Sequence, residues 1–282
     1  MEKTGGSPVA QAFSESKWRR SESVHQNDER TPPGRLIVNA DDWGYDIETT
    51  GKILACAMEG AVSSVSAMVF MEDSVRAAAV ARERGIDAGL HINLTAMFSA
   101  PGCSTMLMAH QEKVSRYLRC HRLAQVVFHP GLVNSFKYVV AAQVDEFERL
   151  YGAAPDRLDG HHHMHLCANV LLQGLLPPGT LVRRNFSFQS GQKSLWNRMY
   201  RRLVDGRLAK RHHLADFFFS LAPLEPPDRL REIISLAQRF VVEVETHPVN
   251  PEEYRFLLEG GISRITGHAM PGEHRPCPSP QP

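Results

Sequence analysis

The chain has 282 residues, which is enough to bury a large hydrophobic core in one domain or two. Its 32 Lys and Arg against 31 Asp and Glu leave no net field that would recruit nucleic acid or an anionic membrane. No apolar run approaches the roughly 20 residues of a membrane helix, and no signal peptide is recognisable. The five scattered cysteines include no CxxC pair, which indicates a reducing compartment. We therefore expect a cytoplasmic protein with no nucleic-acid or membrane partner.

The two ends of the chain differ from its middle. Residues 1–34 are rich in Ser, Glu, Arg, Gln and Gly and show no apolar periodicity, which predicts a disordered extension. Residues 267–282 form a proline-rich tail, because the last twelve carry five of the 18 prolines and can continue neither a helix nor a central strand. The folded domain is expected at 35–266.

Within that domain, runs rich in Val, Ile, Leu and Phe alternate with helical patterns. Strands are expected at 35–40, 62–70, 88–94, 157–161, 180–186, 215–221 and 241–246. Helices are expected at 46–59 with Asp46 as N-cap, 74–84 opened by Ser74, 132–151, 168–176, 194–210 and 227–240. This serial β-α order predicts a parallel sheet covered by helices, since parallel neighbours need crossover connections.

Polar residues at the strand ends favour a barrel over an open sheet. They are Asp41 with Asp42, His91, Asp159 to His165, Arg183 to Asn185, and Glu245 with His247. So many strand ends meet at one rim only if the strands form a ring, whereas an open sheet would spread them along an edge. We therefore predict an α/β fold, a TIM-like (β/α) barrel of about seven parallel strands, and leave open whether it closes completely.

Three of these residues suit a metal ion. Asp42, His91 and His161 offer one carboxylate and two imidazoles, a common protein contribution to a divalent ion with open positions. A cation would also stabilise the adjacent carboxylates of Asp41 and Asp42 in their ionised form. The plain alternatives are a solvated turn for the Asp pair and a surface or core cluster for the HHHMH run at 161–165.

Three motifs resemble a known family. NADDWG at 39–44, GLHINLT at 89–95 and DGHHHMH at 159–165 occur in the order and at the spacing of the YdjC-like carbohydrate deacetylases, which include the chitooligosaccharide deacetylases. The resemblance covers roughly residues 35–250. It implies a barrel fold, one divalent metal ion (Mg or Zn) and a small carbohydrate substrate, while a homo-oligomer is left open.

The resemblance also implies roles for single residues. The family holds its metal with the second Asp of the first motif and the first His of the other two, which are Asp42, His91 and His161 here. Asp41 corresponds to the general base. The sequence departs from the family at Trp43, where Phe is usual, and in AMFSAPG at 96–102, where the substrate loop differs.

Hydrolysis of an acetamide needs an activated water, an acceptor for its proton and a proton donor for the leaving amine. With Asp41 as the acceptor, His247 after the last strand is the candidate donor, and a structural histidine before Pro248 is the alternative. Candidates to orient the ligands or to contact the substrate are His163, His165, and Arg183 or Arg184, with a surface position as the alternative for the arginines.

The leading interpretation is a metal-dependent hydrolase that removes N-acetyl groups from an amino sugar or short oligosaccharide. A hydrolase of another amide or phosphoester, or a catalytically silent carbohydrate-binding protein, is the alternative, and the presence of Asp41 favours an enzyme. Two further stretches are interpreted as follows. Residues 198–211 hold six Lys and Arg, which are interpreted as a solvated helix face rather than a site for an anionic polymer. The stretch 95–131 opens without a clear element and is expected to include a substrate loop.

Overall fold

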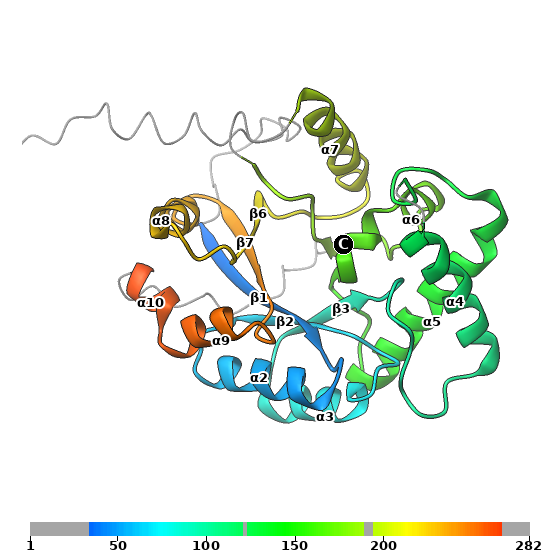
Figure 1. Ribbon diagram of the computed structural model, residues 1–282, viewed down its shortest axis with the longest axis horizontal. Coiled ribbons are helices and arrows are strands. Elements are labelled where there is room, and N and C mark those ends of the chain that lie inside the picture. The colour runs from blue at the N-terminus through cyan, green and yellow to red at the C-terminus, as the bar shows by residue number, and fades with distance from the viewer. Residues whose placement is uncertain (1–33, 121–122, 189–193, 267–282) are drawn as a thin grey trace, which may run out of the picture.

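A computed structural model describes residues 34–120, 123–188 and 194–266 (Figure 1). The predicted N-terminal extension, apart from Gly34, and the predicted proline-rich tail lie outside the described residues. Within the described part of the chain, strands and helices alternate as the sequence predicts.

The strands are β1 (Arg35–Trp43), β2 (Ser64–Ala67), β3 (Ala88–Ile92), β4 (Arg157–Gly160), β5 (Leu181–Val182), β6 (Phe217–Ser220) and β7 (Val241–Thr246). The α-helices are α2 (Ile47–Met58), α3 (Ser74–Arg84), α4 (Thr105–Cys120), α5 (Val133–Tyr151), α6 (Ala168–Gln173), α7 (Leu195–Leu208), α8 (Pro227–Leu236), α9 (Pro251–Leu258) and α10 (Gly261–Thr266). Two short 3₁₀ helices, η1 (Pro130–Leu132) and η2 (His161–Leu166), complete the elements.

The strands form one parallel seven-stranded sheet in the order β5-β4-β3-β2-β1-β7-β6. The sheet curves into a half-barrel, so the predicted parallel barrel is confirmed in its incompletely closed form (Figure 1). Its seam lies between β5 and β6, which share no ladder among the described residues. Isolated backbone hydrogen bonds cross this seam, among them Val182 N to His213 O (2.8 Å) and Ser187 N to Phe218 O (2.8 Å).

Burial explains why these segments adopt their elements. Nearly every residue of β1 is buried, as expected for a parallel strand with both faces covered. Helix α5 turns Phe136, Val140 and Phe147 inward, which lie on one face of the helix. The predicted cap of α2 is confirmed, because the Asp46 carboxylate accepts a hydrogen bond from Thr49 N at 2.7 Å. Among the described helices, none has both the length and the apolar character needed to cross a bilayer.

Several boundaries differ from the sequence predictions. The strand expected at 180–186 ends at Val182, whereas the helix expected at 74–84 is observed as α3 with those bounds. The sequence predicted none of α4, α9 and α10. Helix α4 was missed because it buries polar Gln111 among its apolar positions, and that amide donates to Ala96 O at 2.8 Å. Much of the stretch 95–131 is therefore helical, and the open loop between β3 and α4 is shorter than expected.

Candidate metal centre and active site

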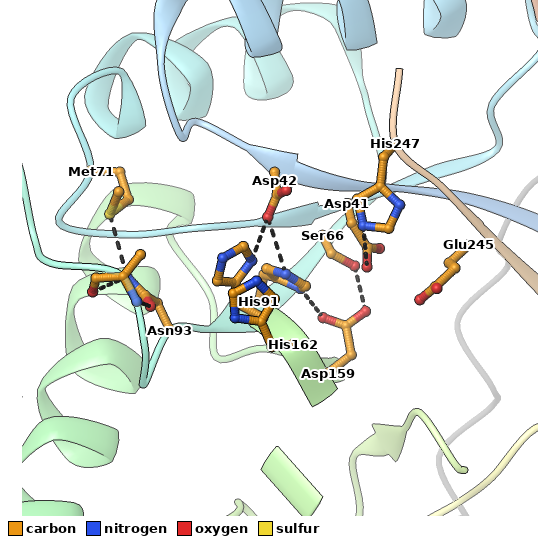
Figure 2. A network of polar contacts seen from close by, with 12 residues as sticks. Asp41, Asp42, Ser66, Met71, His91, Asn93, Asp159, His162, Glu245 and His247 are labelled. Carbon is orange, nitrogen blue, oxygen red and sulfur yellow. Dashed lines mark hydrogen bonds and ion pairs between the residues drawn. The ribbon is translucent and has the colours of Figure 1, made fainter. Parts of the chain in front are cut away.

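The three residues predicted to hold a metal ion meet at the carboxyl end of the sheet (Figure 2). Asp42 lies near the end of β1, His91 lies in β3, and His161 opens η2 directly after β4. Asp42 Oδ1 lies 2.9 Å from His161 Nδ1 and 3.3 Å from His91 Nε2. One ligand atom from each residue lies within 4.8 Å of the others. The fold therefore brings together three side chains that are far apart in the sequence.

The donor set fits a divalent cation. Asp42 Oδ1 is buried, and no donor of ordinary hydrogen-bond geometry reaches it within the described part of the chain. Burial opposes ionisation of this carboxyl, but His161 and His91 hold its pKa well below the usual range. A small cation can be coordinated by such an ionised carboxylate oxygen together with the two imidazole nitrogens that face it.

The backbone bends sharply at both Asp42 and the histidine run. Asp42 has φ of 70°, and His162 and His163 have φ of 54° and 56°, in the left-handed region that side chains other than glycine rarely adopt. Such positions cost on the order of 1–3 kcal/mol each and persist only where the surroundings impose them. The His162 ring is held by Thr95, with Oγ1 3.0 Å from Nδ1. These bends let neighbouring residues face the same rim, which a straight strand would not allow.

A second carboxylate fixes the orientation of His91. Asp159 Oδ1 lies 2.6 Å from His91 Nδ1, and Ser66 Oγ donates to Asp159 Oδ2 at 2.6 Å (Figure 2). The opposite ring nitrogen then points toward Asp42. Burial lowers the pKa of His91, but Asp159 and Asp41 outweigh it and raise this pKa well above its ordinary value. The sequence predictions gave Asp159 no role, although it stands two residues before His161 in the third motif.

Asp41, the predicted base, is clamped by an arginine. Arg183 donates from Nη1 to Asp41 Oδ2 at 2.6 Å and from Nη2 to Oδ1 at 2.7 Å, and Asn39 Nδ2 donates to Oδ1 at 2.7 Å. Burial opposes ionisation, but the guanidinium outweighs it and lowers the pKa of Asp41. The carboxylate is therefore ionised and fixed in direction at neutral pH.

Arg183 holds a buried cluster of carboxylates rather than a surface position. Its side chain is 1% exposed and also contacts Asp159 (2.7 Å), Glu243 (2.7 Å) and Glu245 (3.3 Å). The surface position considered for Arg183 is therefore wrong, because the side chain points into the barrel. Burial, followed by the charge of Asp41, raises the pKa of Glu245 well above its usual value. One guanidinium does not neutralise four carboxylates, so the cluster favours a retained proton.

The remaining predicted residues divide between the rim and the interior. The His247 side chain is 37% exposed, and its Nε2 lies 3.8 Å from Asp41 Oδ2. His163 packs edge-on against Phe186 at 4.7 Å between ring centroids, and burial lowers its pKa to about 3. His165 is buried, with Nε2 2.9 Å from Arg183 O, and burial lowers its pKa to about 4. His247 thus lies at the rim beside Asp41, whereas His165 contacts the backbone that carries Arg183.

A cavity of about 170 Å³ adjoins the histidine run. Its walls include His163, Asn185, Phe186, Arg201 and Phe218. Phe186 and Phe218 stack with their ring centroids 4.6 Å apart, so the cavity has an aromatic wall beside polar groups. This combination suits a small ligand that has both apolar faces and hydrogen-bonding groups.

Comparison with known proteins identifies sequences to which this chain is similar. A family model described as YdjC-like protein matches residues 35–264. The chain is 30% identical over 132 residues to a chitooligosaccharide deacetylase of Proteus mirabilis, covering 46% of this chain and 50% of the relative. It is 32% identical over 152 residues to a carbohydrate deacetylase of Homo sapiens, covering 49% of this chain and 43% of the relative. The chain thus spans about half the length of the curated relatives it matches.

A solved structure shares the fold. It is a protein of Enterococcus faecalis V583 described as a candidate cellobiose-phosphate cleavage protein. The TM-score is 0.58 at 17% sequence identity, and the match covers 84% of this chain and 95% of that chain. At this identity the likeness supports the half-barrel architecture.

Proposed function

The chain belongs to the YdjC-like family, and from this premise we propose that it is a metal-dependent hydrolase that deacetylates an N-acetylated amino sugar or short oligosaccharide. The observation that carries the proposal is that His161 and His91 lie 2.9 Å and 3.3 Å from Asp42 Oδ1, a buried oxygen to which no described residue donates a hydrogen bond of ordinary geometry. The deacetylases of Proteus mirabilis and Homo sapiens support the choice of an acetamide as the scissile group.

Asp42, His91 and His161 would hold one divalent ion. That ion would supply Lewis acidity, which makes water more acidic and an amide carbonyl more electrophilic. Two imidazoles and one carboxylate suit Zn by ligand softness, whereas Mg prefers a site rich in oxygen, so the two metals are tested separately. Because the pKa of His91 is raised, ion binding is expected to displace a proton from this ring.

Asp41 is the proposed proton acceptor. Arg183 keeps it ionised and aims it, so no side-chain rearrangement is needed before it takes a proton. The same ion pair lowers its basicity, which suits a base that accepts its proton from an already acidified water.

His247 is the proposed donor to the leaving amine. It is exposed enough to meet a substrate, and it lies close to Asp41. Its backbone N–H donates to Glu253 Oε2 at 3.0 Å, which anchors the residue while leaving the ring free. An acceptor and a donor beside one candidate metal site favour an enzyme over a silent binding protein.

The experiment is an acetate-release assay on N-acetylated mono-, di- and trisaccharides, with Mg²⁺, Zn²⁺ and Co²⁺ added separately. Asp42→Ala should lose the bound ion by calorimetry, whereas Asp41→Asn should keep the ion and lose turnover by about 10²- to 10⁴-fold. Asp145→Asn, which removes an exposed carboxylate from α5, serves as the matched control and should change neither quantity.

Three results would contradict this proposal. A wild-type protein that binds no divalent ion would end the metal hypothesis. An Asp41→Asn variant with wild-type turnover would remove Asp41 as the base. Release of phosphate from phosphoesters without release of acetate would favour the alternative hydrolase on the same barrel.

A further inference from the structure

Helix α7 presents a row of apolar side chains to solvent. Their exposed fractions are Leu195 72%, Trp196 80%, Met199 59% and Leu203 70%. At about 100° per residue these positions fall within one arc of about 100° on the helix. Val204 and Leu208, on the opposite side, are buried. The outward arc, here called the α7 stripe and made of these four exposed residues, is therefore an apolar surface that no described segment covers.

Only cations flank the stripe. Arg202, Arg207 and Lys210 are exposed within the helix or just beyond its end. The helix has one carboxylate, Asp205, which is buried and accepts from Arg184 Nη2 at 2.8 Å. The α7 stripe is apolar, and the exposed charges beside it on the helix are positive. A complementary partner surface would therefore combine an apolar layer with anionic groups around it.

The charges argue against a second copy of this chain as the occupant. A twofold interface would place the same surface on both sides, so the cations around one stripe would face those around the other. The carbohydrate substrate is also a poor fit, because the cavity lies on the inner side of α7. There Arg201 lines that cavity and stacks over Phe188, with its guanidinium carbon 4.9 Å from the ring centroid. Figure 1 shows α7 at the edge of the molecule, where an extended surface can reach its outer side.

We propose that the α7 stripe docks the protein on an anionic lipid surface. Leu195, Trp196, Met199 and Leu203 enter the boundary between headgroups and acyl chains, and the flanking cations contact the headgroups. The expectation of no membrane partner came from net charge, which averages this local cationic border against acidic residues elsewhere. Docking of this kind needs no spanning helix, and it does not depend on the deacetylase proposal.

The test is binding of the full chain to phosphatidylcholine vesicles with and without about one third phosphatidylglycerol, measured by co-sedimentation and tryptophan fluorescence. Binding is expected with the anionic vesicles at low salt and should weaken as salt rises. In a Trp18→Phe variant, where Trp196 reports beside the buried Trp43, the fluorescence should shift to shorter wavelength, and adding Trp196→Phe should abolish that shift. Leu203→Ser, Arg202→Glu and Arg207→Glu should each weaken binding at least about fivefold.

Two matched controls lie on other helices. Ile47→Ser removes an apolar side chain from α2 that is 62% exposed, and Arg119→Glu reverses an exposed charge on α4. Both should bind as the wild type does. Equal binding to neutral and anionic vesicles, or equal losses in the control and α7 variants, would overturn the proposal. A third result would also overturn it: the chain binds no vesicles, and light scattering shows a dimer that Leu203→Ser abolishes. A second copy of the chain would then cover the stripe.

Discussion

Replacement of Arg183 by lysine tests how much the contacts of Arg183 with the buried carboxylates stabilise the fold. The guanidinium contacts Asp41 with two nitrogens and contacts Asp159, Glu243 and Glu245 with one each. Lysine keeps the charge but carries three donors on one nitrogen, so at least two contacts are lost. Hydrogen bonds to charged groups are worth about 1.5–3 kcal/mol each, and the free energy of unfolding should therefore fall by about 3–6 kcal/mol. That is a large part of a typical domain's stability.

The assay is urea unfolding of wild type and variant, with Arg149→Lys as the matched control. Arg149 on α5 also meets a carboxylate through two nitrogens, both 2.7 Å from Glu146 oxygens, but its side chain is 63% exposed. The same substitution there should cost less than about 0.5 kcal/mol, because water screens the pair. A loss at Arg183 below about 1 kcal/mol, or no greater than at Arg149, would refute the account of the cluster.

The decrease in the free energy of unfolding that Arg183→Lys causes should also depend on pH. With fewer donors, burial should raise the pKa values of Asp41 and Asp159 and leave that of Glu245 raised, so the folded variant should hold protons that the unfolded chain releases. Its stability then falls as the pH rises above the ordinary carboxyl range. The difference from wild type should be larger at pH 8 than at pH 5, and a difference that grows on acidification would contradict this sign.

Two further predictions concern the same region. Asp159→Asn keeps the shape of the side chain but removes the anionic partner of His91. Calorimetry should therefore show an affinity for divalent ions that is about 10- to 100-fold weaker. Unchanged affinity would show that this contact does not affect ion binding. The buried His165 has a pKa of about 4, so between pH 6.5 and 4 the unfolded chain takes up a proton that the folded chain refuses. Thermal melts should show a stability contribution fully present above pH 6.5 and reduced by about 2 kcal/mol at pH 5, and His165→Gln should flatten that dependence.

Much of the architecture was predictable because buried parallel strands are continuous apolar runs. Each of the seven strands was expected within a few residues of its observed position, although β2, β5 and β6 are shorter than expected and β5 is the shortest. The meeting of Asp42, His91 and His161 followed from one geometric fact, namely that the carboxyl ends of parallel strands share a rim. Local patterns were sufficient for both results.

The place of Arg183 was not predictable by the same means. An arginine that ends a strand has the same local sequence whether it faces water or the barrel interior. Its contact with Asp41 joins positions 142 residues apart, one directly after β5 and the other on β1, and these strands are not neighbours in the sheet. Only the curvature of the sheet brings these side chains together. The role of Asp159 depends on the same three-dimensional closure, because it links His91 to Arg183.

The proposed ion ligands and the aromatic wall of the cavity lie on different parts of the half-barrel, and the wall lies at the seam between β5 and β6. The proposed ion ligands come from the ends of β1, β3 and β4, each of which has a neighbouring strand on both sides. The aromatic wall of the cavity, Phe186 and Phe218, lies instead where isolated hydrogen bonds replace a ladder. A substitution of Phe186 or Phe218 is therefore expected to change the shape of the cavity without moving the proposed ion ligands, whereas a shift of Arg183, which follows β5 at the same seam, would reach Asp41. Under the proposed function, the residues that shape the cavity can differ between related chains while the proposed ion ligands stay in place.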